Sequence, residues 1–126
     1  MKTQGEIEAA VSKGVTIFMQ EFMGRGPKDI CTHLIGDILL VRLQGVLTAA
    51  ERHLVDALPA DRGRDLLKQV RTHLVEVSRT RLEKMVEESS GMRCASLHHD
   101  VSTVTGEEVL VFILMQVPGT RFAKNK

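Results

Sequence analysis

The sequence contains few of the residue types that mark a specialised protein. Its 126 residues include two cysteines, three prolines and four phenylalanines, with neither tyrosine nor tryptophan. Cys31 and Cys94 lie in apolar runs without C-x-x-C spacing, which favours buried, reduced thiols over a disulfide or a zinc site. The shortage of aromatic side chains also leaves little on which nucleic-acid bases could stack.

The chain also lacks an excess of one charge and a long hydrophobic run. Its formal net charge is +1, so no global field draws it toward nucleic acid or anionic lipid. The apolar run at residues 109–115 is far shorter than the roughly 20 residues that span a bilayer. Glu6 lies where a signal peptide would be apolar, so we expect a cytoplasmic protein.

What the chain does have is the composition of one globular domain. Hydrophobic residues make up 43% and charged residues 26%, and a chain of this length buries about two-thirds of its unfolded surface. We assign residues 1–117 to a single α+β domain. Residues 118–126 are polar and cationic, and we expect them to form a flexible tail.

Residues 5–23 are predicted to form an amphipathic helix. Apolar residues recur at steps of three and four, at Ile7, Val11, Val15, Phe18 and Phe22. Further apolar residues, Ile17 among them, widen this stripe, which indicates neighbours on two sides, one of them a second subunit. Gly14 has two interpretations, a close approach of another backbone or simple tolerance.

The segment GRGPK, residues 24–28, ends this helix. Glycine supplies a left-handed cap and Pro27 cannot continue the hydrogen-bond ladder. A functional interpretation makes Arg25, Gly26 and Lys28 an anion- or partner-binding nest. The alternative is a structural helix stop, because the dipole at a helix C-terminus opposes an anion.

Two strands are predicted next, at residues 30–35 and 38–43, joined by a tight turn at Gly36-Asp37. Both sides of the second strand are largely apolar. We therefore expect a central strand with helices on one side and a partner on the other.

Two helices are predicted in the middle of the chain. Thr48 and Glu51 have the spacing of a capping box for a helix at residues 49–58, and Asp61 would cap a long helix reaching about residue 89. The expected buried side of the long helix comprises Leu66, Leu67, Val70, Leu74, Val77, Leu82 and Met85. Arg81 falls near the middle of that stripe, either at the edge of the core or in a buried ion pair or ligand contact.

A second hairpin, residues 92–101 and 108–117, completes the domain with a turn at residues 104–107. The predicted order is α-β-β-α-α-β-β. The fold class is therefore α+β, a four-stranded antiparallel sheet with helices packed on one face.

The densest group of reactive side chains is His98-His99-Asp100. Strand alternation puts His98 and Asp100 on one side as a possible polar site and His99 on the other, so the three do not converge on one ion. A metal-dependent enzyme using His98 and Asp100 is one hypothesis for the function, and it is weaker than the nucleic-acid-binding and accessory-subunit hypotheses given below. The chain has no Walker A loop, G-x-G-x-x-G, H-E-x-x-H or G-x-S-x-G motif. We therefore expect no enzyme activity, no cofactor and no metal.

A second hypothesis for the function is a KH-like nucleic-acid-binding or regulatory module, because one class of KH domain has the order α-β-β-α-α-β. Such a domain needs G-x-x-G between its middle helices. Residues 59–64 read PADRGR instead, and the near-zero net charge supplies few phosphate contacts. These features argue against nucleic acid as a partner.

Three segments carry a family resemblance: GRGPK at 24–28, VRLQGVLTAAE at 41–51 and HHDVSTVTGEEVLVF at 98–112. With them the chain, from residue 5 to about 117, resembles the small bacterial proteins called MpsC-like, a former domain of unknown function. The family is named for a sodium-translocating, membrane-potential-generating system, and its relatives are associated with inorganic carbon supply. The resemblance provides no catalytic residues.

The resemblance implies a non-enzymatic accessory subunit of a bacterial membrane ion or inorganic-carbon (bicarbonate) transport system. Its partner would be a multi-spanning membrane protein, and its place the cytoplasm or the inner face of the membrane. The wide stripe of the first helix and the doubly apolar strand at 38–43 would be left exposed in a monomer, so we also expect a homodimer.

Overall fold

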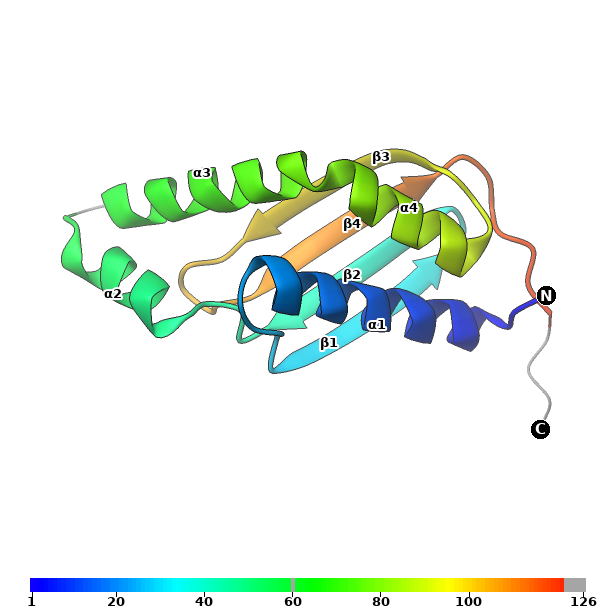
Figure 1. The fold of residues 1–126 in the computed structure, drawn as a ribbon, viewed down its shortest axis with the longest axis horizontal. Coiled ribbons are helices and arrows are strands. Elements are labelled where there is room, and N and C mark those ends of the chain that lie inside the picture. The colour runs from blue at the N-terminus through cyan, green and yellow to red at the C-terminus, as the bar shows by residue number, and fades with distance from the viewer. Residues whose placement is uncertain (60, 122–126) are drawn as a thin grey trace.

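The computed structural model describes residues 1–59 and 61–121. These residues form four helices, α1 (Gln4–Phe22), α2 (Ala49–Ala57), α3 (Arg62–Val77) and α4 (Arg79–Ser90), and four strands, β1 (Asp29–Ile35), β2 (Ile38–Gln44), β3 (Cys94–Val101) and β4 (Glu108–Leu114). The strands make one antiparallel sheet of order β1-β2-β4-β3. α1, α3 and α4 lie across one face of it (Figure 1). The predicted α+β class, with helices on one face, is confirmed.

α1 is fixed at both ends by local signals. Thr3 and Glu6 form a capping box, in which the Glu6 N–H donates to Thr3 Oγ1 and the Glu6 carboxylate accepts from the Thr3 N–H. After the helix, Gly24 has a φ of +82°, which confirms the predicted helix stop. Between them, a Cβ built on Gly14 would lie 2.5 Å from the Met85 side chain, so Gly14 makes room for a side chain of α4 and not for the approaching backbone of the first interpretation.

Both predicted hairpins are present. Ile35 pairs with Ile38 across the Gly36-Asp37 turn, and Gly36 has a φ of +61°. The second hairpin joins β3 to β4 through residues 102–107, where Gly106 has a φ of +74°. Two local turns thus assemble four strands, and the β2–β4 pairing joins the hairpins into one sheet.

The core lies between the sheet and the helices. Alternate residues of the two central strands point to the helices and are fully buried, namely Leu39, Val41 and Leu43 of β2 and Leu110, Phe112 and Leu114 of β4. The side of the sheet away from the helices, which we call the outer face, carries Ile38 and Leu40 of β2 and Val109, Val111 and Ile113 of β4. These outer residues are only half-buried, so β2 is central and apolar on both sides, as predicted.

The single long helix predicted to start near Asp61 and reach residue 89 is wrong. The chain turns at Ser78, where α3 ends and α4 begins. Buried residues of α3 are spaced by four, at Gly63, Leu67, Arg71 and Val75, and such a stripe moves around a helix by about 40° per step. The break brings Leu82 and Val86 of α4 back onto the core. Neither glycine nor proline marks it, so periodicity alone missed it.

The same shift of stripe overturns part of the predicted buried side. Leu67 and Leu82 are buried, but Leu66, Val70 and Val77 are 42%, 46% and 83% exposed. They lie beside the inward positions Leu67, Arg71 and Val75, on the solvent side of α3. We call Leu66, Val70 and Val77 the α3 stripe.

Two local expectations are also wrong. The Asp61 side chain makes no cap hydrogen bond with α3 and instead lies 3.4 Å from Arg64 of the same turn. Cys31 is exposed, because it points to the outer face while its neighbours Thr32 and Leu34 point inward. Cys94 is half-buried.

The two ends of the described chain meet. The Arg121 N–H donates to the Lys2 carbonyl at 3.1 Å, and Arg121 Nε donates to the Met1 carbonyl at 2.7 Å. Of the predicted flexible tail, 118–126, residues 122–126 lie outside the described residues. Residues 118–121 return alongside the N-terminus.

Candidate functional site

The most unusual polar group in the core is Arg71, whose side chain is 1% exposed. It reaches inward from α3 because it occupies the buried stripe between Leu67 and Val75. Its Nη1 lies 3.0 Å from Glu108 Oε1 of β4, and its Nη2 and Nε lie 2.9 and 3.1 Å from the two carboxylate oxygens of Glu51. Nη2 also donates to the Val46 carbonyl at 3.0 Å. One guanidinium therefore joins α2, α3 and the sheet.

Glu108 is the carboxylate of this cluster whose charge is the least well compensated. Its side chain is 0% exposed, and burial raises its pKa to about 7 despite the nearby Arg71. Its second oxygen, Oε2, has no hydrogen-bond partner within the described chain. Burial acts against ionisation of Glu51 too, but hydrogen bonds from Arg71 and Thr48 outweigh it and lower the pKa of Glu51.

Sequence reasoning missed this cluster, although signals for it were present. Thr48 and Glu51 form the predicted capping box, and Glu51 was assigned no other partner. Glu108 begins the alternation Glu108, Leu110, Phe112, Leu114, all of which face inward. A charge in such an alternation needs a partner, and Arg71 is the buried cation that meets it. Because the Arg71 and Glu108 side chains are almost inaccessible, the cluster suits a structural clamp better than a substrate site.

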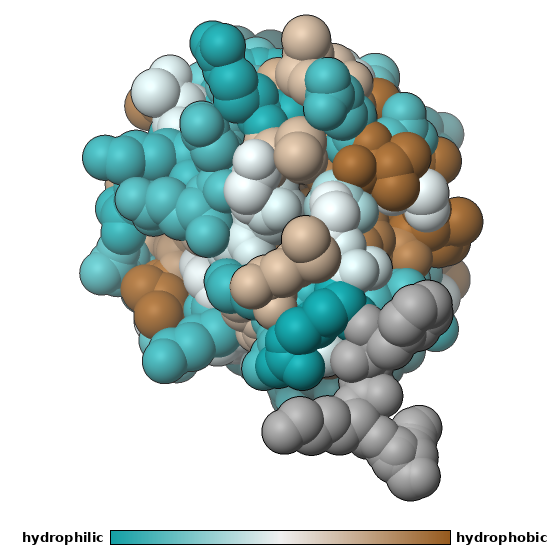
Figure 2. Space-filling model, turned by 90° about the vertical axis from the view of Figure 1, so that its right-hand side faces the viewer, coloured by the Kyte–Doolittle hydropathy of each residue, from teal (hydrophilic) through white to brown (hydrophobic). Residues whose placement is uncertain are grey.

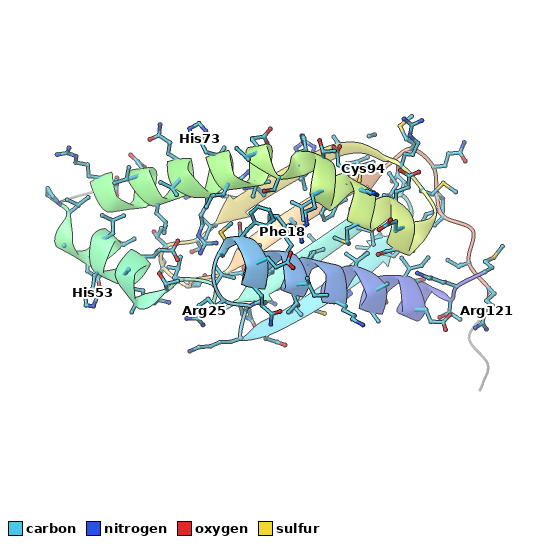
Figure 3. The ribbon with its side chains drawn as sticks, in the orientation of Figure 1. Phe18, Arg25, His53, His73, Cys94 and Arg121 are labelled. Carbon is cyan, nitrogen blue, oxygen red and sulfur yellow. The ribbon has the colours of Figure 1, made fainter. Side chains whose placement is uncertain are left out.

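The predicted anion nest is engaged with its own chain. Arg25 donates from Nη2 to the Gly45 carbonyl at 3.1 Å and from Nη1 to the Leu47 carbonyl at 3.5 Å. Lys28 lies over Gly45, where a Cβ would come within 2.7 Å of the lysine side chain. Figure 3 shows Arg25 in the loop below the end of α1. Gly26 is half-buried against Gln20 and Thr16 of α1.

The polar residues of β3 divide between the two sides of the sheet, as alternation predicts. His98 and Asp100 are exposed, and His99 is half-buried on the other side. His98 Nε2 lies 3.2 Å from Ser96 Oγ, and Asp100 accepts from Lys68 Nζ at 3.0 Å, which lowers the pKa of the Asp100 carboxyl. Burial lowers the pKa of His99. His98 and Asp100 share a side but have separate partners.

Arg81 lies at the edge of the core. Its guanidinium carbon is 4.9 Å from the centre of the Phe22 ring, and it forms an ion pair with Glu21. Phe22 in turn stacks on Phe18, which projects between α1 and the α3–α4 pair in Figure 3. Arg81 thus covers an exposed aromatic ring and ties α4 to α1.

The described residues provide no convergent metal-ligating set. Nowhere in residues 1–59 and 61–121 do three or more His, Cys, Asp or Glu side chains come close enough to hold a metal ion. His53 and His73 illustrate this dispersal, since they project from α2 and α3 in opposite directions in Figure 3. Across the same residues, no helix has both the length and the hydropathy needed to cross a bilayer.

Similarity to known proteins extends over nearly the whole chain. Residues 3–116 match the family described as Na+-translocating membrane potential-generating system (MpsC). The chain is also similar to the uncharacterized protein YbcI of Bacillus subtilis (strain 168), with 34% identity over 113 residues that cover 90% of this chain and 89% of YbcI. No solved structure matches it. The resemblance in the three sequence segments is therefore confirmed, and the chain belongs to the MpsC family.

Proposed function

We propose that this protein is a non-enzymatic accessory subunit of a bacterial membrane system that moves ions or inorganic carbon. In this proposal the protein lies in the cytoplasm, at the inner face of the membrane, and binds a membrane-embedded subunit. The observation that carries the proposal is the match of residues 3–116 to a family described as a Na+-translocating, membrane-potential-generating system.

The use of charged side chains supports a role without chemistry. Arg71, Glu51 and Glu108 hold elements of the core together, and Arg25 binds carbonyl groups of its own chain. Asp100 is paired with Lys68. These charged groups are thus engaged with partners in their own chain, which favours a binding module.

The α3 stripe supplies a surface for the membrane partner. Leu66, Val70 and Val77 project from one helix, outside the core, and a partly exposed apolar row of this kind fits a groove on another protein. Ile17 and Phe22 of α1 are also 41% and 40% exposed on the helical side of the sheet. We assign this side, and the α3 stripe first, to the membrane-embedded subunit.

A capture experiment from native bacterial membranes tests the proposal. The tagged full-length chain should recover a multi-spanning protein from detergent extracts. Val77→Asp should abolish recovery, because it places a charge in the apolar contact while 83% exposure leaves the fold undisturbed. Val104→Asp, in the β3–β4 loop and 87% exposed, is the matched control and should retain the partner.

Two results would overturn the proposal. One is a chain that recovers no multi-spanning protein, or recovers it equally well with Val77→Asp. The other is recovery of RNA with an affinity that falls steeply as salt is added, which would move the function to the KH-like alternative.

A further inference from the structure

The outer face has a simple plan, with an apolar centre and polar margins. Strand register places its residues in three rows across the sheet: Cys31, Arg42, Val109 and Asp100; His33, Leu40, Val111 and His98; Ile35, Ile38, Ile113 and Ser96. The two middle residues of every row come from the central strands β2 and β4. Five of the six central residues are aliphatic and half-exposed. None of the four described helices covers them (Figure 1).

The end view in Figure 2 shows the contrast between the two sides of the molecule. Hydrophobic side chains, in brown, gather on the side away from the helices, and the helical side is mostly hydrophilic there. That end of the sheet contains the β1–β2 turn and the end of β4, with Ile35 58% and Met115 63% exposed. Soluble proteins seldom leave a continuous apolar surface of this kind uncovered.

Two of the three charged side chains that the strands place on the outer face are neutralised. Arg42 forms an ion pair with Glu107, and Asp100 forms one with Lys68 at 3.0 Å. The third, Asp29 at the start of β1, forms no ion pair among the described residues, so a second copy of the same face would meet this one uncompensated charge at its margin. A face with an apolar centre and mostly paired charges at its margin is compatible with itself, which a twofold contact requires.

The free edges of the sheet are less suited to pairing than the outer face. On β1, the Leu34 N–H donates to Glu8 at 2.8 Å and the Leu34 carbonyl accepts from Gln4 at 3.0 Å, both side chains of α1. On β3, the Leu97 carbonyl accepts from Arg79 of α4 at 3.3 Å. Backbone groups that an added strand would need are thus occupied by helical side chains.

The size of the outer face sets the strength of a contact. Seven-residue strands are about 23 Å long and four of them span about 19 Å, so two copies would bury roughly 900 Å² in total. That area is slightly below the roughly 1,000 Å² expected of a specific, stable interface. It fits a reversible dimer in the micromolar range and is too small for an obligate one.

We propose that the outer face binds the outer face of a second copy, so that two sheets pack as a sandwich with the helices outside. Aligned sheets pack about 10 Å apart through interdigitated aliphatic side chains, which Leu40, Val109 and Val111 supply in both copies. The proposal is independent of the membrane partner, which we assign to the opposite side of the molecule.

Sedimentation equilibrium of the full chain over a range of about 1 to 500 µM tests the dimer. The mass should fall on dilution from twice 14.0 kDa toward 14.0 kDa. Leu40→Asp should remain at the monomer mass throughout, because two aspartates would meet in the apolar centre. Val104→Asp, on the β3–β4 loop, should dimerise like the unmodified chain.

A less disruptive substitution tests the dimer if Leu40→Asp does not fold. Replacing Val109 and Val111 together with threonine preserves side-chain shape, and should raise the dimer dissociation constant at least about tenfold with an unchanged circular dichroism spectrum. A chain that is monomeric over the whole range overturns the proposal. So does a dimer whose dissociation constant is the same in the threonine variant.

Discussion

Arg71 Nη1 and Glu108 Oε1 lie 3.0 Å apart in the core, although 37 residues separate them in the chain. The arginine belongs to α3 and the glutamate to the first position of β4. Glu51 binds the same guanidinium from α2. One cation held between two carboxylates therefore joins the sheet to the α2–α3 unit, beside the apolar contacts of Leu67 and Val75.

Arg71→Met is expected to destabilise the fold by about 3–5 kcal/mol, because it leaves Glu108 buried without a counter-charge. Urea unfolding followed by circular dichroism measures the change. Adding Glu108→Leu to Arg71→Met should restore most of the loss, since both buried positions are then apolar.

Lys68→Met is the control for this pair. Lys68 is on the same helix as Arg71, and its exposed ion pair is with Asp100 of β3. Loss of this pair should cost less than about 1 kcal/mol. An Arg71→Met protein as stable as the Lys68→Met protein would show that the buried cluster contributes nothing.

Glu108 should make the folded protein less stable as pH rises, which is the opposite of the usual effect of a carboxylate. Its pKa is about 7 in the folded protein against an ordinary 4.5, so between these values the folded state holds a proton that the unfolded state has released. The free energy of unfolding contributed by this group therefore falls as pH rises from 4.5 to 7, and is constant above. His99, whose pKa burial lowers, contributes a rise in stability below pH 6.5, so urea unfolding at several pH values should show the decline as the difference between the unmodified chain and Glu108→Gln.

Glu108→Gln should flatten the decline, because the amide does not titrate. The control is Glu87→Gln, an exposed carboxylate on α4 that should leave the slope intact. A slope that persists unchanged in Glu108→Gln would assign it to another group.

Two glycines in helices should respond differently to alanine. A Cβ on Gly63 would lie 2.7 Å from the Leu54 carbonyl oxygen and from the Val55 Cα, which are backbone atoms of α2. Gly63→Ala should force α2 away from α3 and cost about 1–3 kcal/mol. Gly14→Ala meets only the flexible Met85 side chain and should cost less. Thermal unfolding of the two variants compares them, and equal midpoints would contradict the prediction.

The starts of α2 and α3 offer a second matched pair. Thr48→Ala removes a capping box and should destabilise by about 1 kcal/mol. Asp61→Ala removes a residue that makes no cap hydrogen bond and should change stability by less than about 0.5 kcal/mol. Urea unfolding measures both. A larger loss for Asp61→Ala would mean that it stabilises α3 through charge.

The two thiols should differ in reactivity. Cys31 is exposed on the outer face, whereas burial raises the pKa of the Cys94 thiol to about 11 and reduces its thiolate fraction. With Ellman's reagent at pH 8, one thiol should react quickly and the other slowly. Cys31→Ser should remove the fast phase, and a fast phase that remains would assign it to Cys94.

The features that sequence predicted correctly are those whose partners are close in the chain. The capping box joins Thr48 to Glu51, three residues away, and the first hairpin closes at Gly36-Asp37. The Arg71 cluster was missed because its partners come together only when α3 packs on the sheet. The break at Ser78 was missed for the same reason, since its effect, the return of Leu82 and Val86 to the core, involves residues far apart in the chain.

The candidate binding surfaces were predicted in part. Alternation in β2 correctly gave a strand apolar on both sides, because period-two patterning needs no tertiary information. The α3 stripe was wrongly placed in the core, because Leu66 and Leu67 are both apolar and only packing decides which one turns inward.

The helical side chains that occupy the sheet edges have an order in the chain. Gln4 and Glu8 precede Leu34, and Arg79 precedes Leu97, so each closing helix is synthesised before the edge strand it covers. A polypeptide leaving the ribosome from its N-terminus would thus form neither edge strand without its closing helix already available. The order of the elements therefore lets each of the two edge strands be closed as soon as it forms, whereas β2 stays an open edge until β4 has been made.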